Sequence, residues 1–337
     1  MPPDDPKPNP GKAQAPLSIQ DGLSLAAQHQ AAGRIAEAER IYRQILEMEP
    51  NEPVALHRLG VIAHMAGHSD AAIQMIRAAI SLVPEYVSAH CNLGHVFLDL
   101  SNFEEAVASY SEAVAIKPEH ARAHASLAFA LKNSGKLDKA ISSYSKSLKI
   151  DPSDANTHCN LGNSYLDKGE LDKAVACYRS ALAIQPGFAE VYCNLGSALK
   201  HQGLVDEAIA CYQKALALKP DYPEAHNNLG TALQKKGLVE EAAQCYSKAL
   251  SQRADFVDAH SNLGSALWSL RRLEEAAASY RRALEIDPST SEAAGSLGSV
   301  LLAMGESKEG LEMENKGFGV ISFDITSGVN YNFENQK

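Results

Sequence analysis

A spacing of 34 residues runs through almost the whole chain. Glycine recurs at this spacing, and Ala26 and Ala128 occupy two further points of the same lattice. Prolines between Pro50 and Pro288, and alanines between Ala38 and Ala276, recur with the same spacing in two other registers. Three registers in phase indicate an array of repeats rather than one globular fold. The lattice glycines are Gly60, Gly94, Gly162, Gly196, Gly230, Gly264 and Gly298.

Each repeat predicts two helices. We number a repeat from the seventh residue before its lattice position, so repeats begin at 19, 53, 87, 121, 155, 189, 223, 257 and 291, the ninth being partial. In the fifth repeat Gly162 lies in the first helix, Gly169 ends it, and Pro186 stops the second. Glycine suits that break because it adopts the left-handed conformation at no Cβ cost. Ser101 and Arg271 are the exceptions at this position.

The period, the small residues where helices approach and the terminal proline resemble the tetratricopeptide repeat (TPR) family. The resemblance implies an all-α superhelical solenoid of helix-turn-helix repeats whose first helices line the concave side. We expect three segments in the chain. They are a disordered proline-rich arm at 1–18, the TPR array at 19–305, and a polar cap helix with a hairpin-like tail at 306–337.

Composition narrows the class of partner. The net charge of −10 argues against nucleic acid, because phosphate binding needs a concentrated basic face. No stretch is long and apolar enough to predict a membrane span, and the first 18 residues lack the apolar segment of a signal peptide. We therefore expect a cytoplasmic location and a protein or peptide partner.

The cysteines and most histidines follow the repeat. Three of the six cysteines occupy position 5 and three occupy position 23, which predicts reduced thiols used as small packing residues. Five histidines share position 4 and are interpreted as packing residues. No Cys-x-x-Cys, Gly-x-Ser-x-Gly or His-Glu-x-x-His motif is present. The sequence thus predicts neither an enzyme nor a metal or cofactor site.

Position 6 carries the feature with a functional interpretation. Asparagine is a poor helix former, yet it recurs there two residues before the glycine. It is rotated about 100° from the buried leucine that follows, toward the concave side or its margin. A carboxamide can bond the backbone of an extended peptide whatever its side chains, or it can bond a neighbouring repeat and stiffen the array. The candidate peptide-binding residues, called the asparagine row below, are Asn92, Asn160, Asn194, Asn228 and Asn262.

Phrases such as His90-Cys91-Asn92-Leu93-Gly94 and Cys193-Asn194-Leu195-Gly196 are similar to the TPR superhelix of the protein O-GlcNAc transferase family. The resemblance implies that the row forms a ladder holding substrate peptides, although Arg58, Ser126 and Ser296 interrupt it. About thirty residues follow the array, too few for a glycosyltransferase domain. We expect a non-enzymatic peptide- or protein-binding scaffold; the alternative is the substrate-recognition arm of a glycosyltransferase system whose catalytic part lies elsewhere.

The last residues depart from the repeat. Apolar residues alternate with polar ones at Ile321, Phe323 and Ile325 and again from Val329, with a turn at Thr326-Ser327-Gly328 between them. This pattern predicts a short β-hairpin. Such a hairpin is marginal alone, so it is expected to cap the last helices, to pair with another chain in self-association, or to belong to a further domain.

Overall fold

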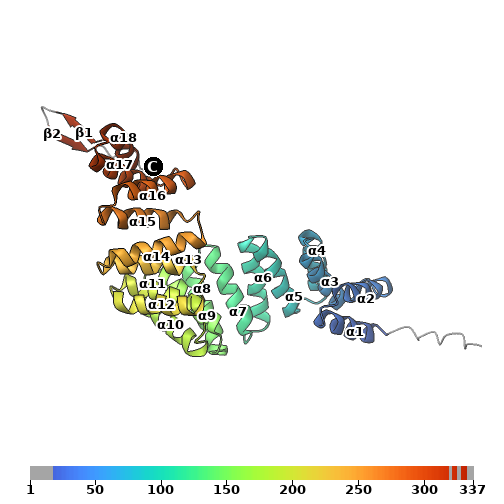
Figure 1. The fold of residues 1–337 in the computed structure, drawn as a ribbon. Coiled ribbons are helices and arrows are strands. Elements are labelled where there is room, and N and C mark those ends of the chain that lie inside the picture. The colour runs from blue at the N-terminus through green and yellow to red at the C-terminus, as the bar shows by residue number, and fades with distance from the viewer. Residues whose placement is uncertain (1–17, 319–320, 325–327, 332–337) are drawn as a thin grey trace, which may run out of the picture. The chain divides into compact units, whose positions relative to one another are not determined.

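The computed structural model describes residues 18–318, 321–324 and 328–331. The chain divides into two compact units, Met1–Pro152 (unit 1) and Ser153–Lys337 (unit 2), and each is considered by itself. Within the described residues the repeats form pairs of α-helices in chain order, coloured from blue to red in Figure 1. From residue 19 to residue 318 the fold is an all-helical solenoid of helix pairs, as the repeat pattern predicts.

Unit 1 contains four helix pairs, one for each of the first four repeats. They are α1 (Ile19–Ala31), α2 (Ile35–Met48), α3 (Pro53–Met65), α4 (Ser69–Leu82), α5 (Val87–Asp99), α6 (Phe103–Ile116), α7 (Ala121–Asn133) and α8 (Leu137–Ile150).

Unit 2 contains five helix pairs followed by two strands. They are α9 (Ala155–Asp167), α10 (Leu171–Ile184), α11 (Ala189–His201), α12 (Val205–Leu218), α13 (Pro223–Lys235), α14 (Val239–Gln252), α15 (Val257–Ser269), α16 (Leu273–Ile286), α17 (Ser291–Met304), α18 (Ser307–Phe318), β1 (Ile321–Asp324) and β2 (Gly328–Tyr331).

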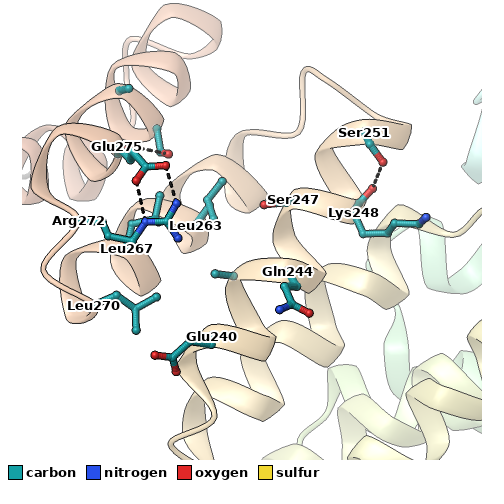
Figure 2. Close-up of a pocket in the computed structure, with 13 residues that line it drawn as sticks. Glu240, Gln244, Ser247, Lys248, Ser251, Leu263, Leu267, Leu270, Arg272 and Glu275 are labelled. Atoms are coloured by element: carbon teal, nitrogen blue, oxygen red, sulfur yellow. Dashed lines mark hydrogen bonds and ion pairs between the residues drawn. The ribbon is translucent and has the colours of Figure 1, made fainter.

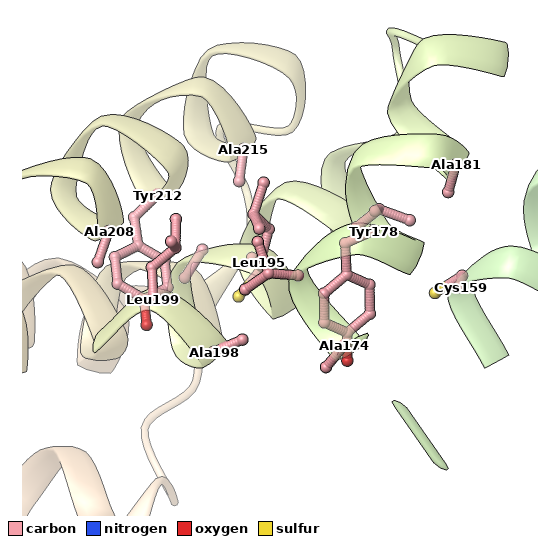
Figure 3. Close-up of a cluster of buried hydrophobic side chains, with 14 of the residues drawn as sticks. Cys159, Ala174, Tyr178, Ala181, Leu195, Ala198, Leu199, Ala208, Tyr212 and Ala215 are labelled. Atoms are coloured by element: carbon pink, nitrogen blue, oxygen red, sulfur yellow. The ribbon is translucent and has the colours of Figure 1, made fainter. Parts of the chain in front are cut away.

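Five of the seven lattice glycines make room for a tyrosine of the same repeat, whereas Gly60 faces Ile76 and Gly298 faces the backbone of α18. A Cβ atom added to Gly196 would lie 2.8 Å from Cε1 of Tyr212, so the two helices approach closely only because position 8 is small. The tyrosine rings pack against the glycines of their own repeats. Figure 3 shows Tyr178 and Tyr212 among the alanines and leucines of this core.

The first helix of a repeat ends as the glycine pattern predicts. Around Gly203 the N–H of Gly203 bonds the carbonyl of Lys200, and the N–H of Leu204 bonds the carbonyl of Leu199. This is a Schellman motif, which needs a left-handed residue at its end. Gly203 has φ +82°, and the two exceptions, Ser101 and Arg271, take the same conformation with φ 58° and 61°.

The first helices of neighbouring repeats also touch one another. In unit 1 α3 contacts α5, and in unit 2 contacts join α9 to α11, α11 to α13, α13 to α15 and α15 to α17. The first helices therefore form the inner side of each stack, where residues at positions 6 and 9 lie. None of the helices among the described residues has the length and apolar character needed to cross a bilayer.

The ninth repeat has a second helix, α18, in the segment for which the sequence predicts a polar cap helix. Gly298 and Gly310 let α17 and α18 approach very closely, since a Cβ on Gly298 would lie 2.5 Å from the backbone nitrogen of Glu314. Beyond α18, β1 and β2 pair antiparallel with Ile321 opposite Tyr331 and Asp324 opposite Gly328. Ile325, the turn residues Thr326 and Ser327, and the arm at 1–17 lie outside the described residues.

Candidate functional site

The asparagine row lies on the first helices of five repeats, on α5 in unit 1 and on α9, α11, α13 and α15 in unit 2. All five side chains are half-buried. The leucine after each one is buried or nearly so, because the helix turns by about 100° per residue. The row is therefore partly exposed on the first helices of its unit.

The structure gives the row partners in the preceding repeat. In four of the five asparagines the carboxamide nitrogen points to the side chain at position 5 of the repeat before it. The contacts are Asn92 Nδ2 to His57 Nε2 (2.7 Å), Asn194 Nδ2 to Cys159 Sγ (3.9 Å), Asn228 Nδ2 to Cys193 Sγ (3.7 Å) and Asn262 Nδ2 to Asn227 Oδ1 (2.9 Å).

Asn160 differs from the other members. It belongs to the first repeat of unit 2, and position 5 of the repeat before it is Ala125, which has no side-chain acceptor. Asn160 shares the row's place on the helix, but the sequence offers it no side-chain acceptor at position 5 of the preceding repeat.

Sequence reasoning missed the role of position 5. It treated the cysteines there as small packing residues, whereas the structure also makes Cys159 and Cys193 acceptors for the row. The recurrence of acceptor-bearing side chains at positions 5 and 6, 35 residues apart between one repeat and the next, was the signal available in the sequence. This recurrence indicates a contact between positions 5 and 6 only when neighbouring first helices are known to touch.

Position 9 connects the row to the core. Oδ1 of Asn163 accepts a hydrogen bond from Tyr178 at 2.7 Å and another from Asn194 at 3.1 Å. Ser197 and Tyr212 form the equivalent pair in the next repeat at 3.1 Å. The same tyrosine ring that packs on the lattice glycine therefore fixes the residue beside the row. Asn194 is thus held by two contacts, Cys159 and Asn163, which both belong to the preceding repeat.

Burial sets the protonation of groups next to the row. His57 is fully buried, and desolvation together with the Arg58 charge lowers the pKa of its imidazole to about 4. It is therefore neutral near pH 7. Because Asn92 donates to Nε2, the proton of His57 lies on Nδ1 and is directed to the hydroxyl of Tyr86 at 3.0 Å. Burial also raises the pKa of the Cys193 thiol, which disfavours a reactive thiolate.

The position 4 histidines hold the turn between repeats. In four of them Nε2 donates to a backbone carbonyl six residues earlier, at the end of the preceding repeat. The acceptors are Pro84 for His90 (2.9 Å), Pro118 for His124 (2.9 Å), Pro220 for His226 (3.2 Å) and Ala254 for His260 (3.0 Å). The predicted packing role is thus supplemented by a directional bond to the turn. Over the described part of the chain no three histidine, cysteine or acidic side chains gather as a metal site would require.

Three grooves lie on the opposite, second-helix side. Each is lined by the second helices of two successive repeats and floored by positions 7 and 11 of the first helix between them. The largest, of about 750 Å³, lies between α14, α15 and α16 and is shown in Figure 2. Its size is consistent with Ala243 at position 21, where Ile209 stands in the preceding repeat. The asparagine row lines none of these three grooves.

Three family models match the chain. The model described as "Cilia and flagella-associated protein 70 C-terminal domain" matches residues 4–220, which is more than half of the sequence. Two models described as "Tetratricopeptide repeat" match residues 187–255 and 227–291. A search of curated protein sequences gave no match.

Solved structures give similarity of fold. The Cut9–Hcn1 hetero-tetramer of APC/C matches with a TM-score of 0.58 and 19% identity over 79% of this chain, which spans 52% of that chain. PilF of Pseudomonas aeruginosa matches with a TM-score of 0.55 and 22% identity over 61% of this chain and 94% of that one. MamA matches at 30% identity over 48% of this chain and 95% of its own, with a TM-score of 0.45.

Proposed function

Because the chain belongs to the tetratricopeptide-repeat family described as Cilia and flagella-associated protein 70 C-terminal domain, we propose that it is a non-enzymatic scaffold that binds extended peptide segments of other proteins. The proposed contact residues are the asparagine row. The partner lies along the inner side of the first helices, with backbone groups of the peptide bonded to the carboxamides.

One observation carries the proposal: the carboxamides of Asn194 and Asn262 are oriented but not saturated. The nitrogen of Asn262 is bonded to Asn227, which fixes the plane of the amide, and the same holds for Asn194 on Asn163. Their oxygens accept no hydrogen bond from any residue in the described ranges. A half-buried acceptor that is already oriented loses little entropy when it accepts a peptide N–H.

The spacing of the row suits an extended chain. Packed helices lie about 8–10 Å apart, and an extended peptide rises about 3.3 Å per residue. One residue in about three would therefore meet a row member. Unit 2 carries four consecutive members, Asn160, Asn194, Asn228 and Asn262, enough for a peptide of about ten residues.

The same argument limits the affinity. Four hydrogen bonds at about 0.5–1.5 kcal/mol each give a few kcal/mol. Association costs about 4–15 kcal/mol. The row alone cannot hold a peptide tightly, so side-chain contacts or a second binding site must contribute. We expect the scaffold to bind peptides weakly and to tolerate several peptide registers and sequences.

An array of extended peptides of varied sequence tests the proposal. The full chain and the variant Asn160→Ala with Asn194→Ala and Asn228→Ala are compared on the same array. Loss of the carboxamides should weaken most bound peptides together, because the backbone is common to all of them. A matched control replaces Gln244, Ser247 and Ser251 of the second-helix side by alanine. If the triple variant keeps its binding while its melting temperature falls, the row is structural and the proposal fails.

A second candidate rests on the Asn-Leu-Gly phrases that resemble the TPR superhelix of the O-GlcNAc transferase family. In this case the chain would deliver substrate peptides to a separate glycosyltransferase. A glycosyltransferase that co-purifies with the chain and loses activity toward peptides when the row is replaced would favour it. Labelling of the same peptides in the absence of the chain would exclude it.

Three further expectations accompany the scaffold. The acidic balance of the chain argues against nucleic acid partners, which a mobility-shift assay with duplex and single-stranded probes would check.

Self-association through the C-terminal tail would appear as a molecular mass in solution above that of one chain, which falls when residues 319–337 are removed. The cytoplasmic location stays a prediction, and imaging of the tagged full chain would test it.

A further inference from the structure

The groove between α6, α7 and α8 in unit 1 differs from the other two second-helix grooves in its charge. It has a volume of about 350 Å³, within the range of binding pockets. Val107, Leu127 and Leu131 supply an apolar lining, and the charged residues that line it are Lys136, Lys139 and Lys146. None of the lining residues carries a carboxylate. Glu104 and Glu112, which lie on α6, are not among them.

In the equivalent groove between α14, α15 and α16 the positive charge is paired with a carboxylate. There Arg272, at the position of Lys136, is held by Glu275 in two hydrogen bonds of 2.6 and 2.7 Å. Glu275 stands at the position of Lys139. Figure 2 shows this pair at the rim of that groove. The groove between α2, α3 and α4 carries Glu39 and Glu47, with Arg43 paired to Glu39.

The three lysines have no such compensation. All three side chains are exposed, and within the described part of the chain none of them forms an ion pair. Lys139 and Lys146 lie seven residues apart on one face of α8, and Lys136 is the N-cap residue of that helix. The exposed Ser142 adds a hydroxyl on the same edge. An apolar floor is thus bordered along one edge by uncompensated positive charge, in a chain whose net charge is −10.

We propose that this basic groove is a second interaction surface, which takes an acidic amphipathic helix of a partner protein. Apolar side chains spaced by three or four residues would pack on Leu127 and Leu131, which are one helical turn apart on α7. Glutamate or aspartate side chains on the flank of that helix would pair with Lys136, Lys139 and Lys146. The surface lies on the second-helix side and so does not depend on the asparagine row.

The probe for the test is a fluorescent amphipathic peptide of about 15 residues, long enough for marginal helicity, with leucines on one face and glutamates beside them. One control peptide carries lysines in place of the glutamates, and another carries glutamines in place of the leucines. Fluorescence anisotropy with the full chain should show binding of the first peptide, weakened by salt. Both control peptides should bind at least about tenfold more weakly.

Charge variants of the full chain locate the site. Lys136→Glu with Lys139→Glu and Lys146→Glu should weaken the acidic peptide by at least about tenfold. The control Lys117→Glu with Lys235→Glu and Lys308→Glu changes the net charge equally, at exposed sites outside the three grooves, and should change affinity less than about twofold. Circular dichroism confirms folding, and the triple lysine-to-glutamine variant provides a milder second test.

Several results would overturn the proposal. If the groove variant and the control variant lose affinity for the acidic peptide equally, net charge, not the groove, attracts the peptide. Equal binding of the lysine peptide would remove the argument from charge. Self-association of the full chain that disappears only in the groove variant would make a second copy, not a partner helix, the occupant. The Asn160→Ala, Asn194→Ala, Asn228→Ala variant should bind the acidic peptide unchanged, so failure here and failure of the proposed function are distinguishable.

Discussion

Asn262 donates its side-chain N–H to the side-chain oxygen of Asn227 at 2.9 Å, across the boundary between two neighbouring repeats. Asn227 is buried and Asn262 is half-buried, so the bond is largely shielded from water on one side. It joins position 6 of one repeat to position 5 of the repeat before. A residue proposed to contact the ligand is therefore also a link in the stack.

A double-mutant cycle measures this link. Asn227→Ala, Asn262→Ala and the double variant are compared by urea unfolding of the full chain. A neutral buried hydrogen bond contributes about 0.5–1.5 kcal/mol, so we expect a coupling free energy of that size. A cycle between Asn227 and Asn160, which are not in contact, serves as the control. Coupling indistinguishable from the control would show that the bond contributes nothing to the stack.

The left-handed residues Ser101 and Arg271 are expected to be destabilising where they stand. Their φ values of 58° and 61° cost a non-glycine residue about 1–2 kcal/mol. Part of this is offset because glycine is more flexible in the unfolded chain. Ser101→Gly and Arg271→Gly should each raise the free energy of unfolding by about 0.5–1 kcal/mol.

The reverse change supplies the control for that prediction. Gly203 has φ +82°, and a Cβ added to it would have no neighbouring atom within 4 Å, so Gly203→Ala introduces backbone strain without a clash. It should lower stability by about 1 kcal/mol in the same unfolding assay. If both glycine substitutions destabilise, the turn at this position does not limit stability.

The close approach of α17 and α18 makes Gly298 more sensitive than the other lattice glycines. A Cβ there would meet backbone atoms of Glu314 and Gly310 at 2.5 and 2.7 Å, which can move only with the helix. Gly298→Ala should cost about 1–3 kcal/mol and raise hydrogen exchange in α18. In Gly264→Ala the added Cβ meets the ring of Tyr280 at 2.9 Å, and a smaller effect without loss of α18 is expected. Equal protection of α18 in both variants would contradict this account.

His57 gives unit 1 a specific dependence on pH. Its pKa is about 4 in the folded chain against about 6.5 when unfolded, so the unfolded state binds the proton more tightly. The stability that neutral His57 contributes is fully present above about pH 6.5 and is lost as pH falls through about 4, by about 3 kcal/mol in total. His57→Gln keeps an amide that can bond Tyr86 and Asn92 but does not titrate.

Hydrogen exchange of α3 and α5 as a function of pH measures the difference between the two proteins. The difference in opening free energy should be flat above pH 6.5 and should grow toward pH 4. Identical pH profiles for the natural chain and for His57→Gln would show that His57 does not control the stability of these helices.

Local rules were sufficient to predict the helices. Gly169 and Pro186 bound the second helix of their repeat in the sequence, and the structure has α10 between them at Leu171–Ile184. The residue type of Arg271 does not predict its left-handed conformation, because the Schellman motif that ends α15 imposes that conformation. Likewise, the contact of Asn194 with Cys159 depends on the distance between first helices, which packing determines.

The most direct test of the central claim compares two members of the asparagine row by affinity and by melting temperature. Asn262 bonds Asn227, whereas the residue equivalent to Asn227 in the repeat before Asn160 is Ala125, which has no side-chain acceptor. If the row contacts the ligand, Asn160→Ala and Asn262→Ala should both weaken capture of extended peptides, and only Asn262→Ala should lower the melting temperature. The account is contradicted if Asn160→Ala binds peptides as well as the natural chain does, because the row would then serve only to join the repeats.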